Sequence, residues 1–172
     1  LSNDVDQVFY NPAGSALKDE SIQASIHYNS WLADITQNCL AVAYNWKNVG
    51  TIALGVQTFG VSDIEADRDL IAAGGTDGAG SQYETYSYMD LGISLTYSRY
   101  LLDNLSLGAT VKFLNESIDG ENMNTVAFDL GSVYDIGLLD WKIAARLSNL
   151  GNDVSYFFTE HPIPMAFSIG TS

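Results

Sequence analysis

The chain has 172 residues, of which 47% are hydrophobic and 12% aromatic, so it can bury the core of one domain. Seven basic residues oppose 21 acidic ones, which gives a formal net charge of -14. Nucleic-acid binding needs clustered Lys and Arg against phosphate, so this charge argues against a nucleic-acid partner. The single cysteine, Cys39, excludes an internal disulfide framework, and its place in a predicted strand favours a small wall residue over a nucleophile.

Residues 1–20 carry little regular pattern, and we expect them to form a plug or cap segment against strands built from residues 21–172. Asn11-Pro12-Ala13-Gly14 predicts a turn, because Pro fixes φ and Gly frees it. One helical turn is predicted over residues 15–19. The chain opens without a signal-peptide pattern, which is typical of a mature or trimmed start.

The remaining residues predict a series of strands, because apolar side chains alternate with small or polar ones. The predicted strands cover residues 21–28, 36–46, 51–59, 86–100, 105–118, 125–134 and 141–148, with an eighth from 165 onwards. The alternation is strictest at 105–113, where Leu107 and Val111 share one face with other apolar residues while Ser106 and Thr110 lie opposite. A soluble sheet on a core and a membrane barrel wall both fit this pattern.

Connection lengths and aromatic positions favour the barrel. Short turns follow the second, fourth and sixth strands, whereas residues 60–85 and 149–164 form long connections after the third and seventh. Such an asymmetry between two rims is typical of outer-membrane barrels, as are aromatic girdles at the strand ends. The girdle residues would be Tyr28, Trp31, Tyr44, Trp46, Tyr97, Tyr100, Tyr134 and Trp141. The predicted fold is therefore all-β, an antiparallel up-and-down transmembrane β-barrel with about eight strands present.

The charged residues within strands fall on the small, polar face. They are Lys112, Asp129, Lys142 and Arg146. A confined lumen with paired charges explains this better than a face in bulk water. We therefore expect these four residues to face the lumen and Leu95, Leu107, Val111 and Ile143 to face lipid. His27 also lies on the polar face, where a hydrogen-bonded structural role is favoured over a metal-ligand role.

The two long connections are predicted to lie on the same outer rim. The first is acidic and Gly-rich and includes Asp63; calcium is a possible ligand there, although EF-hand and nonapeptide spacings are absent. The second contains Tyr156, Phe157 and Phe158, which are typical interface anchors. Asp63 and these aromatics are the predicted protein-binding surface. In the alternative interpretation the aromatics form the upper girdle or cover the lumen.

Several short motifs, taken in order, resemble the PorV/PorQ family of outer-membrane proteins, which are similar to the FadL-like barrels. They are Asn11-Pro12-Ala13-Gly14, Trp31-Leu32-Ala33-Asp34, Val61-Ser62-Asp63-Ile64, Leu105-Ser106-Leu107-Gly108 with Lys112-Phe113, Ala127-Phe128-Asp129-Leu130-Gly131, Ser148-Asn149-Leu150-Gly151 and Pro162-Ile163-Pro164. The resemblance implies a larger barrel, so we expect this chain to be part of a longer protein. It also implies a place in the bacterial outer membrane, in contact with lipid, and a role in type IX secretion or surface attachment; the alternative is a FadL-like channel for hydrophobic small molecules.

The sequence offers no enzymatic motif. It has no Gly-x-Ser-x-Gly elbow, no supported Ser/His/Asp order and no metal-ligand spacing. Asp129 near Lys142 or Arg146 is better explained by a lumen salt bridge than by catalysis. We therefore predict a non-enzymatic protein without catalytic residues, metal or cofactor.

Overall fold

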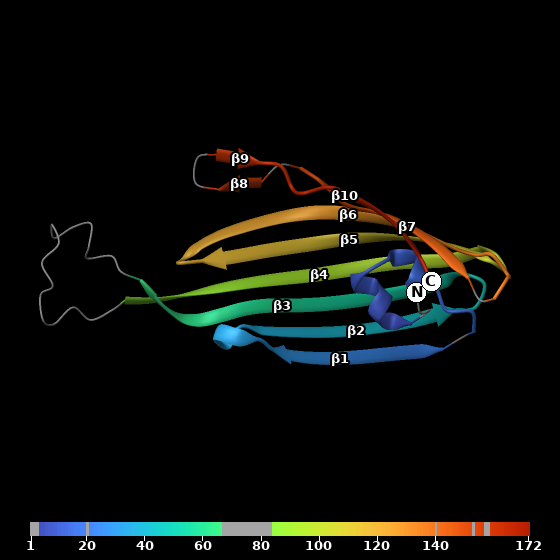
Figure 1. Cartoon of the computed structure of the whole chain (residues 1–172), viewed down its shortest axis with the longest axis horizontal. Coiled ribbons are helices and arrows are strands. Elements are labelled where there is room, and N and C mark those ends of the chain that lie inside the picture. Colours follow the sequence, from blue (N-terminus) through green and yellow to red (C-terminus); the bar gives the residue numbers. More distant parts are fainter. Residues whose placement is uncertain (1–3, 20, 67–83, 140, 153, 157–158) are drawn as a thin grey trace, which may run out of the picture.

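The structure is a computed structural model that describes residues 4–19, 21–66, 84–139, 141–152, 154–156 and 159–172. Eight strands form one antiparallel sheet in the order β1-β2-β3-β4-β5-β6-β7-β10, so that β7 pairs with β10 past a separate β8–β9 hairpin (Figure 1). They are β1 (Ile22–Ser30), β2 (Thr36–Trp46), β3 (Gly50–Ala66), β4 (Glu84–Leu102), β5 (Leu105–Ile118), β6 (Glu121–Asp135), β7 (Lys142–Gly151) and β10 (Ala166–Thr171). The prediction of an all-β antiparallel meander is confirmed. Among the described residues β1 and β10 are the two edges, so the sheet is not closed into a barrel.

The two faces of the sheet differ in side-chain size and in exposure. On one face the large apolar residues are open: Leu95 is 55%, Leu107 41%, Val111 45% and Ile143 41% exposed. On the other face Thr96, Thr110 and their neighbours are small and buried. Period-2 alternation therefore sorts the side chains as predicted, with Leu107 on the open face. We call these the apolar face and the small-residue face.

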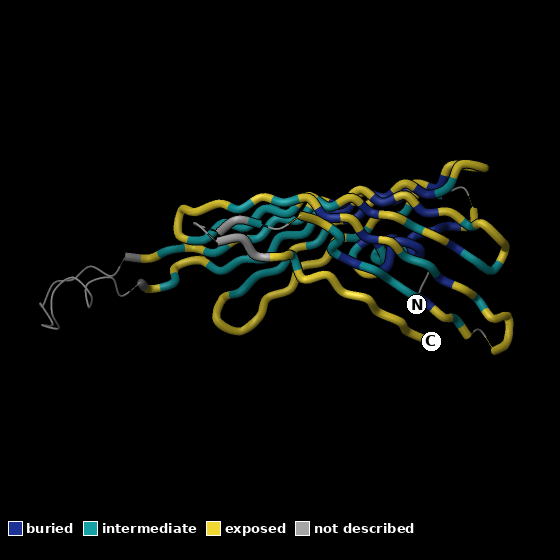
Figure 2. Tube along the Cα trace, turned by 90° about the horizontal axis from the view of Figure 1, so that it is seen from above, coloured by how far each residue is buried: buried dark blue, intermediate teal, exposed yellow. Residues whose placement is uncertain are grey.

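The N-terminal segment, residues 4–19, covers part of the small-residue face. It contains two short 3-10 helices, η1 (Val5–Phe9) and η2 (Pro12–Ser15); a third, η3 (Leu32–Asp34), connects β1 to β2. Buried residues gather in the half of the sheet against which this segment lies (Figure 2). Val5, Val8 and Leu17 form a core cluster with alanines of β2 and β3, and the cluster is tight because alanines let the backbones approach. No helix in the described residues has the length and apolar character needed to cross a membrane.

Hydrogen bonds hold η2 against the sheet, and two glycines of the sheet leave room for its close approach. Ser106 Oγ donates to the carbonyl of Ala13 at 3.0 Å, and the Asn11 amide donates to backbone carbonyls of β6 and β7 at 3.4 Å. A Cβ on Gly108 would lie 2.4 Å from the Pro12 carbonyl carbon, and one on Gly131 would lie 2.0 Å from Asn11 Oδ1. Both glycines therefore permit an approach that any other residue would block.

Several element boundaries differ from the sequence prediction. β3 continues to Ala66 and β4 begins at Glu84, so the connection between them is shorter than predicted. The connection after β7 contains a hairpin, β8 (Val154–Tyr156) and β9 (Thr159–His161), where an irregular loop was expected. The helical turn expected at residues 15–19 is instead η2, which begins at Pro12, a residue well suited to the start of a helix.

The close approach at Gly108 gives a first prediction. We expect Gly108→Ala to displace η2 and to destabilise the fold by about 1–3 kcal/mol, as overpacking does. Lys18 is the only Lys or Arg in residues 1–20, so trypsin cleavage after Lys18 measures release of the segment. The matched control is Gly170→Ala, because a Cβ there has no atom within 4 Å. Equal cleavage rates in the two variants would contradict the packing described here.

Candidate functional site

Asp129 of β6 is the centre of a buried charge cluster on the small-residue face. Its side chain is 4% exposed and accepts from Lys112 Nζ at 2.8 Å and from Arg146 Nη2 at 2.6 Å. The backbone N–H of Asn149 donates to the same carboxylate at 2.9 Å, and Lys112 Nζ also donates to Asn149 Oδ1 at 2.6 Å. The structure thus brings three of the four predicted lumen charges together. Two cations on one carboxylate satisfy its oxygens, which leaves no free base there.

A β-bulge in β7 makes this cluster possible. Phe128 pairs with Leu150 and Leu130 with Leu147, so two residues of β7 lie opposite Asp129 alone. Asn149 adopts a left-handed φ of 59°, which Asn tolerates better than most residues. The extra residue turns the backbone N–H of Asn149 toward Asp129 and its side-chain oxygen toward Lys112. Bulges often re-aim groups in this way.

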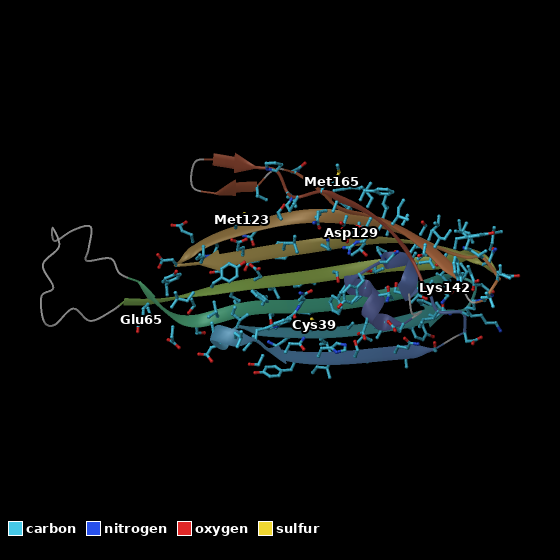
Figure 3. All side chains as sticks on the ribbon, viewed as in Figure 1. Cys39, Glu65, Met123, Asp129, Lys142 and Met165 are labelled. Carbon is cyan, nitrogen blue, oxygen red and sulfur yellow. The ribbon has the colours of Figure 1, made fainter. Side chains whose placement is uncertain are left out.

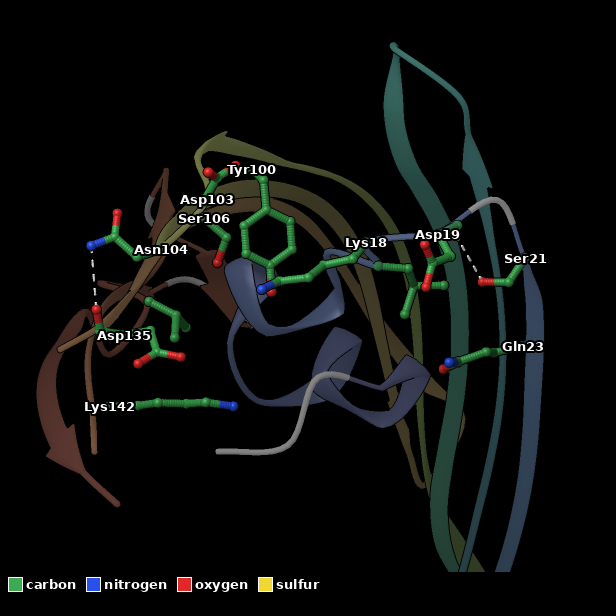
Figure 4. Close-up of a pocket in the computed structure, with 12 residues that line it drawn as sticks. Lys18, Asp19, Ser21, Gln23, Tyr100, Asp103, Asn104, Ser106, Asp135 and Lys142 are labelled. Atoms are coloured by element: carbon green, nitrogen blue, oxygen red, sulfur yellow. Dashed lines mark hydrogen bonds between the residues drawn. The ribbon is translucent and has the colours of Figure 1, made fainter. Parts of the chain in front are cut away.

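The fourth predicted charge, Lys142, lies elsewhere. Figure 3 shows Asp129 near the middle of the sheet and Lys142 at the end where the short turns lie. There Lys142 lines a cavity of about 310 Å³ together with Lys18, Tyr100 and Asp135 (Figure 4). Lys18 Nζ lies 5.1 Å from the centroid of the Tyr100 ring, a cation–π contact that ties the N-terminal segment to β4. Charges of both signs line this cavity, so it favours neither a cationic nor an anionic ligand.

A second polar contact anchors η1 to the edge strand β1. Asp6 accepts from the Ser25 hydroxyl and lies 3.0 Å from His27 Nε2. The Ser25 hydrogen bond lowers the pKa of Asp6 and His27 lowers it further, against the opposing effect of burial. A lowered pKa keeps this carboxylate ionised until the pH falls below its usual titration range. His27 thus has the hydrogen-bonded role expected of it, and Ser25 and His27 both contact the same oxygen of Asp6.

The predicted protein-binding residues are placed only in part. Asp63 does not lie in a loop but within β3, at a bulge between Val61 and Ile64, with a φ of 56°. Tyr156 ends β8, and Phe157 and Phe158 lie outside the described residues, as does most of the acidic connection. The end of β3, the start of β4 and the β8–β9 hairpin lie at the same end of the sheet, together with the short β5–β6 turn and opposite the turns that follow β2, β4 and β6 (Figure 1). We call this the loop end and the other the turn end.

Sequence reasoning missed several residues on which the small-residue face depends. Asn149 was assigned to a loop, and Asp90 and Glu116 were not singled out although they lie directly opposite each other on β4 and β5. Gly108 and Gly131 fall on the polar face of their strands, and glycine in a strand interior is a signal for close backbone approach. Within the described ranges no group of three or more His, Cys, Asp or Glu could hold a metal ion.

Comparison with protein families, with curated proteins and with solved structures finds no match to this chain.

The charge cluster gives a second prediction. Asp129→Asn leaves Lys112 and Arg146 without a counter-charge, and we expect the free energy of unfolding to fall by about 3 kcal/mol. This is the lower end for a broken buried pair, because the two cations keep side-chain exposures of 16% and 25%. Denaturant unfolding measures the change. Asp103→Asn in the exposed β4–β5 turn is the control, with an expected change within about 0.5 kcal/mol; an equal loss in both variants would contradict the cluster's role.

Proposed function

We propose that this chain is part of a non-enzymatic bacterial outer-membrane β-barrel of the PorV/PorQ type, which supports type IX secretion or surface attachment. The observation that carries the proposal is the uncovered apolar face. Leu54, Leu95, Phe128 and Leu130 are each about half exposed, and Ile26 on the edge strand is 81% exposed. Soluble proteins rarely expose contiguous apolar patches beyond a few hundred Å², whereas lipid covers such a face in a barrel.

The small-residue face supports the same assignment. In a soluble two-sided sheet this face would meet water and carry many charges, but here its charges are few, and Lys112 and Arg146 are paired with the buried Asp129. Free edges are not tolerated in lipid, so the proposal requires that further strands pair with β1 and β10. A barrel larger than the described sheet follows from this requirement.

The N-terminal segment favours the secretion or attachment role over the channel. A FadL-like channel for hydrophobic small molecules needs an open path along the small-residue face. Val8, Pro12, Ala13 and Ser15 are buried against that face, and Ser15 Oγ lies 3.0 Å from Ser98 Oγ of β4. A segment that packs this closely supports a plug, and it leaves the loop end as the surface for a protein partner.

Location gives the third prediction. We expect the full-length protein, expressed in a Gram-negative host, to fractionate with detergent-extracted outer membranes and to migrate differently on gels before and after heating. The apolar face of β5 supports this placement, because lipid would cover Leu107 and Val111, which are exposed on it. Recovery as a soluble periplasmic protein would refute the proposal.

The aromatics of the second long connection give the fourth prediction. Replacing Tyr156, Phe157 and Phe158 by Ser should weaken capture of a secreted cargo protein in a pull-down, because buried aromatics dominate interface energetics. Barrel assembly, measured by heat-dependent migration, should be unchanged. The matched control replaces Leu138 and Leu139, exposed at the turn end, by Ser. If capture is unchanged and assembly is lost instead, the aromatics are structural and the docking surface lies elsewhere.

A further inference from the structure

A cavity of about 460 Å³ lies on the small-residue face toward the loop end, beyond the N-terminal segment. Leu114 of β5 and Met123 of β6 line it from the sheet, and Val154 and Ile163 line it from the chain that follows β7. Figure 3 shows Met123 displaced from Asp129 toward the loop end. Its volume and largely apolar lining are those of a small-molecule site, in which a few polar groups fix the orientation of the ligand.

Two carboxylates meet in this cavity. Asp90 of β4 is the direct cross-strand partner of Glu116 of β5, and both line the cavity. Like charges directly opposite each other destabilise a sheet, and a cation between them would relieve the repulsion. Asp90 Oδ2 accepts from the Tyr88 hydroxyl at 2.7 Å, but Oδ1 is buried without a hydrogen-bond partner within the described residues. A buried carboxylate oxygen without a donor is costly, so the site is complementary to a cation with N–H donors.

The nearby cation of the chain does not fill this role, since Lys112 is bound to Asp129 and Asn149. A metal ion suits the site poorly, because the described part of the chain offers no set of three acidic, His or Cys ligands. Gln57, Asn115, Thr125 and Asn149 are the other polar residues of the lining, and most of the remaining lining is apolar. An ammonium group has three donors and can be carried on an apolar body that matches those walls.

We propose that this cavity binds a small amphipathic amine, with its ammonium group between Asp90 and Glu116 and its apolar body against Leu114, Met123 and Ile163. The cavity borders the Asp129 cluster at Asn149 and is covered by Val154 and Ile163 of the 149–164 connection, but its two carboxylates belong to neither the cluster nor the predicted docking residues. It goes beyond the proposed secretion or attachment role, and only its measurement in nanodiscs rests on the proposed membrane placement.

Hexylamine, hexanol and hexanoate are matched probes, because they share an apolar chain and differ in charge. Binding is measured by calorimetry on the full-length protein in phosphatidylcholine nanodiscs, with empty nanodiscs subtracted. We expect hexylamine to bind about tenfold or more tightly than hexanol, as a charge-assisted hydrogen bond provides, and hexanoate to bind least. Equal affinities for amine and alcohol would overturn the proposal.

Variants assign the binding to this cavity. Asp90→Asn with Glu116→Gln should abolish the preference for the amine, and Glu116→Gln alone, which leaves the Tyr88–Asp90 bond in place, should lower it in part. Glu121→Gln, an exposed carboxylate at the same end and outside the cavity, is the matched control.

Gly92→Leu should block all three probes by filling the cavity, since a Cβ at Gly92 meets only Leu114 Cδ2 at 3.5 Å and Gln57 O at 3.9 Å. Amine binding unchanged in the double variant, or calcium binding at these carboxylates without amine binding, would overturn the proposal.

Discussion

Each strand of this sheet presents two faces with opposite requirements, and the division of residues between them determines the rest of the structure. Apolar residues such as Leu95 and Leu107 remain uncovered on one face, while Thr96 and Thr110 are buried on the other, where their hydroxyls lie 2.7 Å apart. A one-residue slip in any strand would exchange the two sets. Register is therefore held by the cost of placing leucines against the N-terminal segment and of moving the paired hydroxyls to the open apolar face.

The small side chains of the small-residue face allow the N-terminal segment to cover part of it. Alanines at 41, 43 and 53 admit the valines of η1, and the glycines at 108 and 131 admit the backbone of η2. The Asp129 cluster lies beside this contact and pairs one buried carboxylate with two cations. Further toward the loop end the segment no longer covers the sheet, and there the inner face has a cavity and an unrelieved pair of carboxylates. One face thus combines a closed half with an open half.

Local alternation was enough to predict the eight strands of the main sheet, their meander order and the two faces of the sheet, because all three follow from period 2 and short turns, but it did not predict the β8–β9 hairpin. It was not enough for features that arise between strands. The bulge at Asn149 depends on a left-handed residue opposite Asp129, and Ser148-Asn149-Leu150-Gly151 reads equally well as the start of a loop. The Asp90–Glu116 pair appears only once the register of β4 and β5 is known. The 3-10 helices are too short to show a helical period of apolar residues, so the sequence pattern does not predict them.

The most direct test of the account is the solvent that each face meets. Nitroxide labels at Leu107 and Val111, introduced in a Cys39→Ser background, report the apolar face, and a label on the native Cys39 reports the small-residue face. In reconstituted bilayers the account predicts that oxygen relaxes the labels at 107 and 111 strongly and a water-soluble nickel chelate does not. The label at Cys39 should show weaker relaxation by oxygen. Strong relaxation by the nickel chelate at 107 and 111 would show that water, not lipid, covers the apolar face, and would contradict the account.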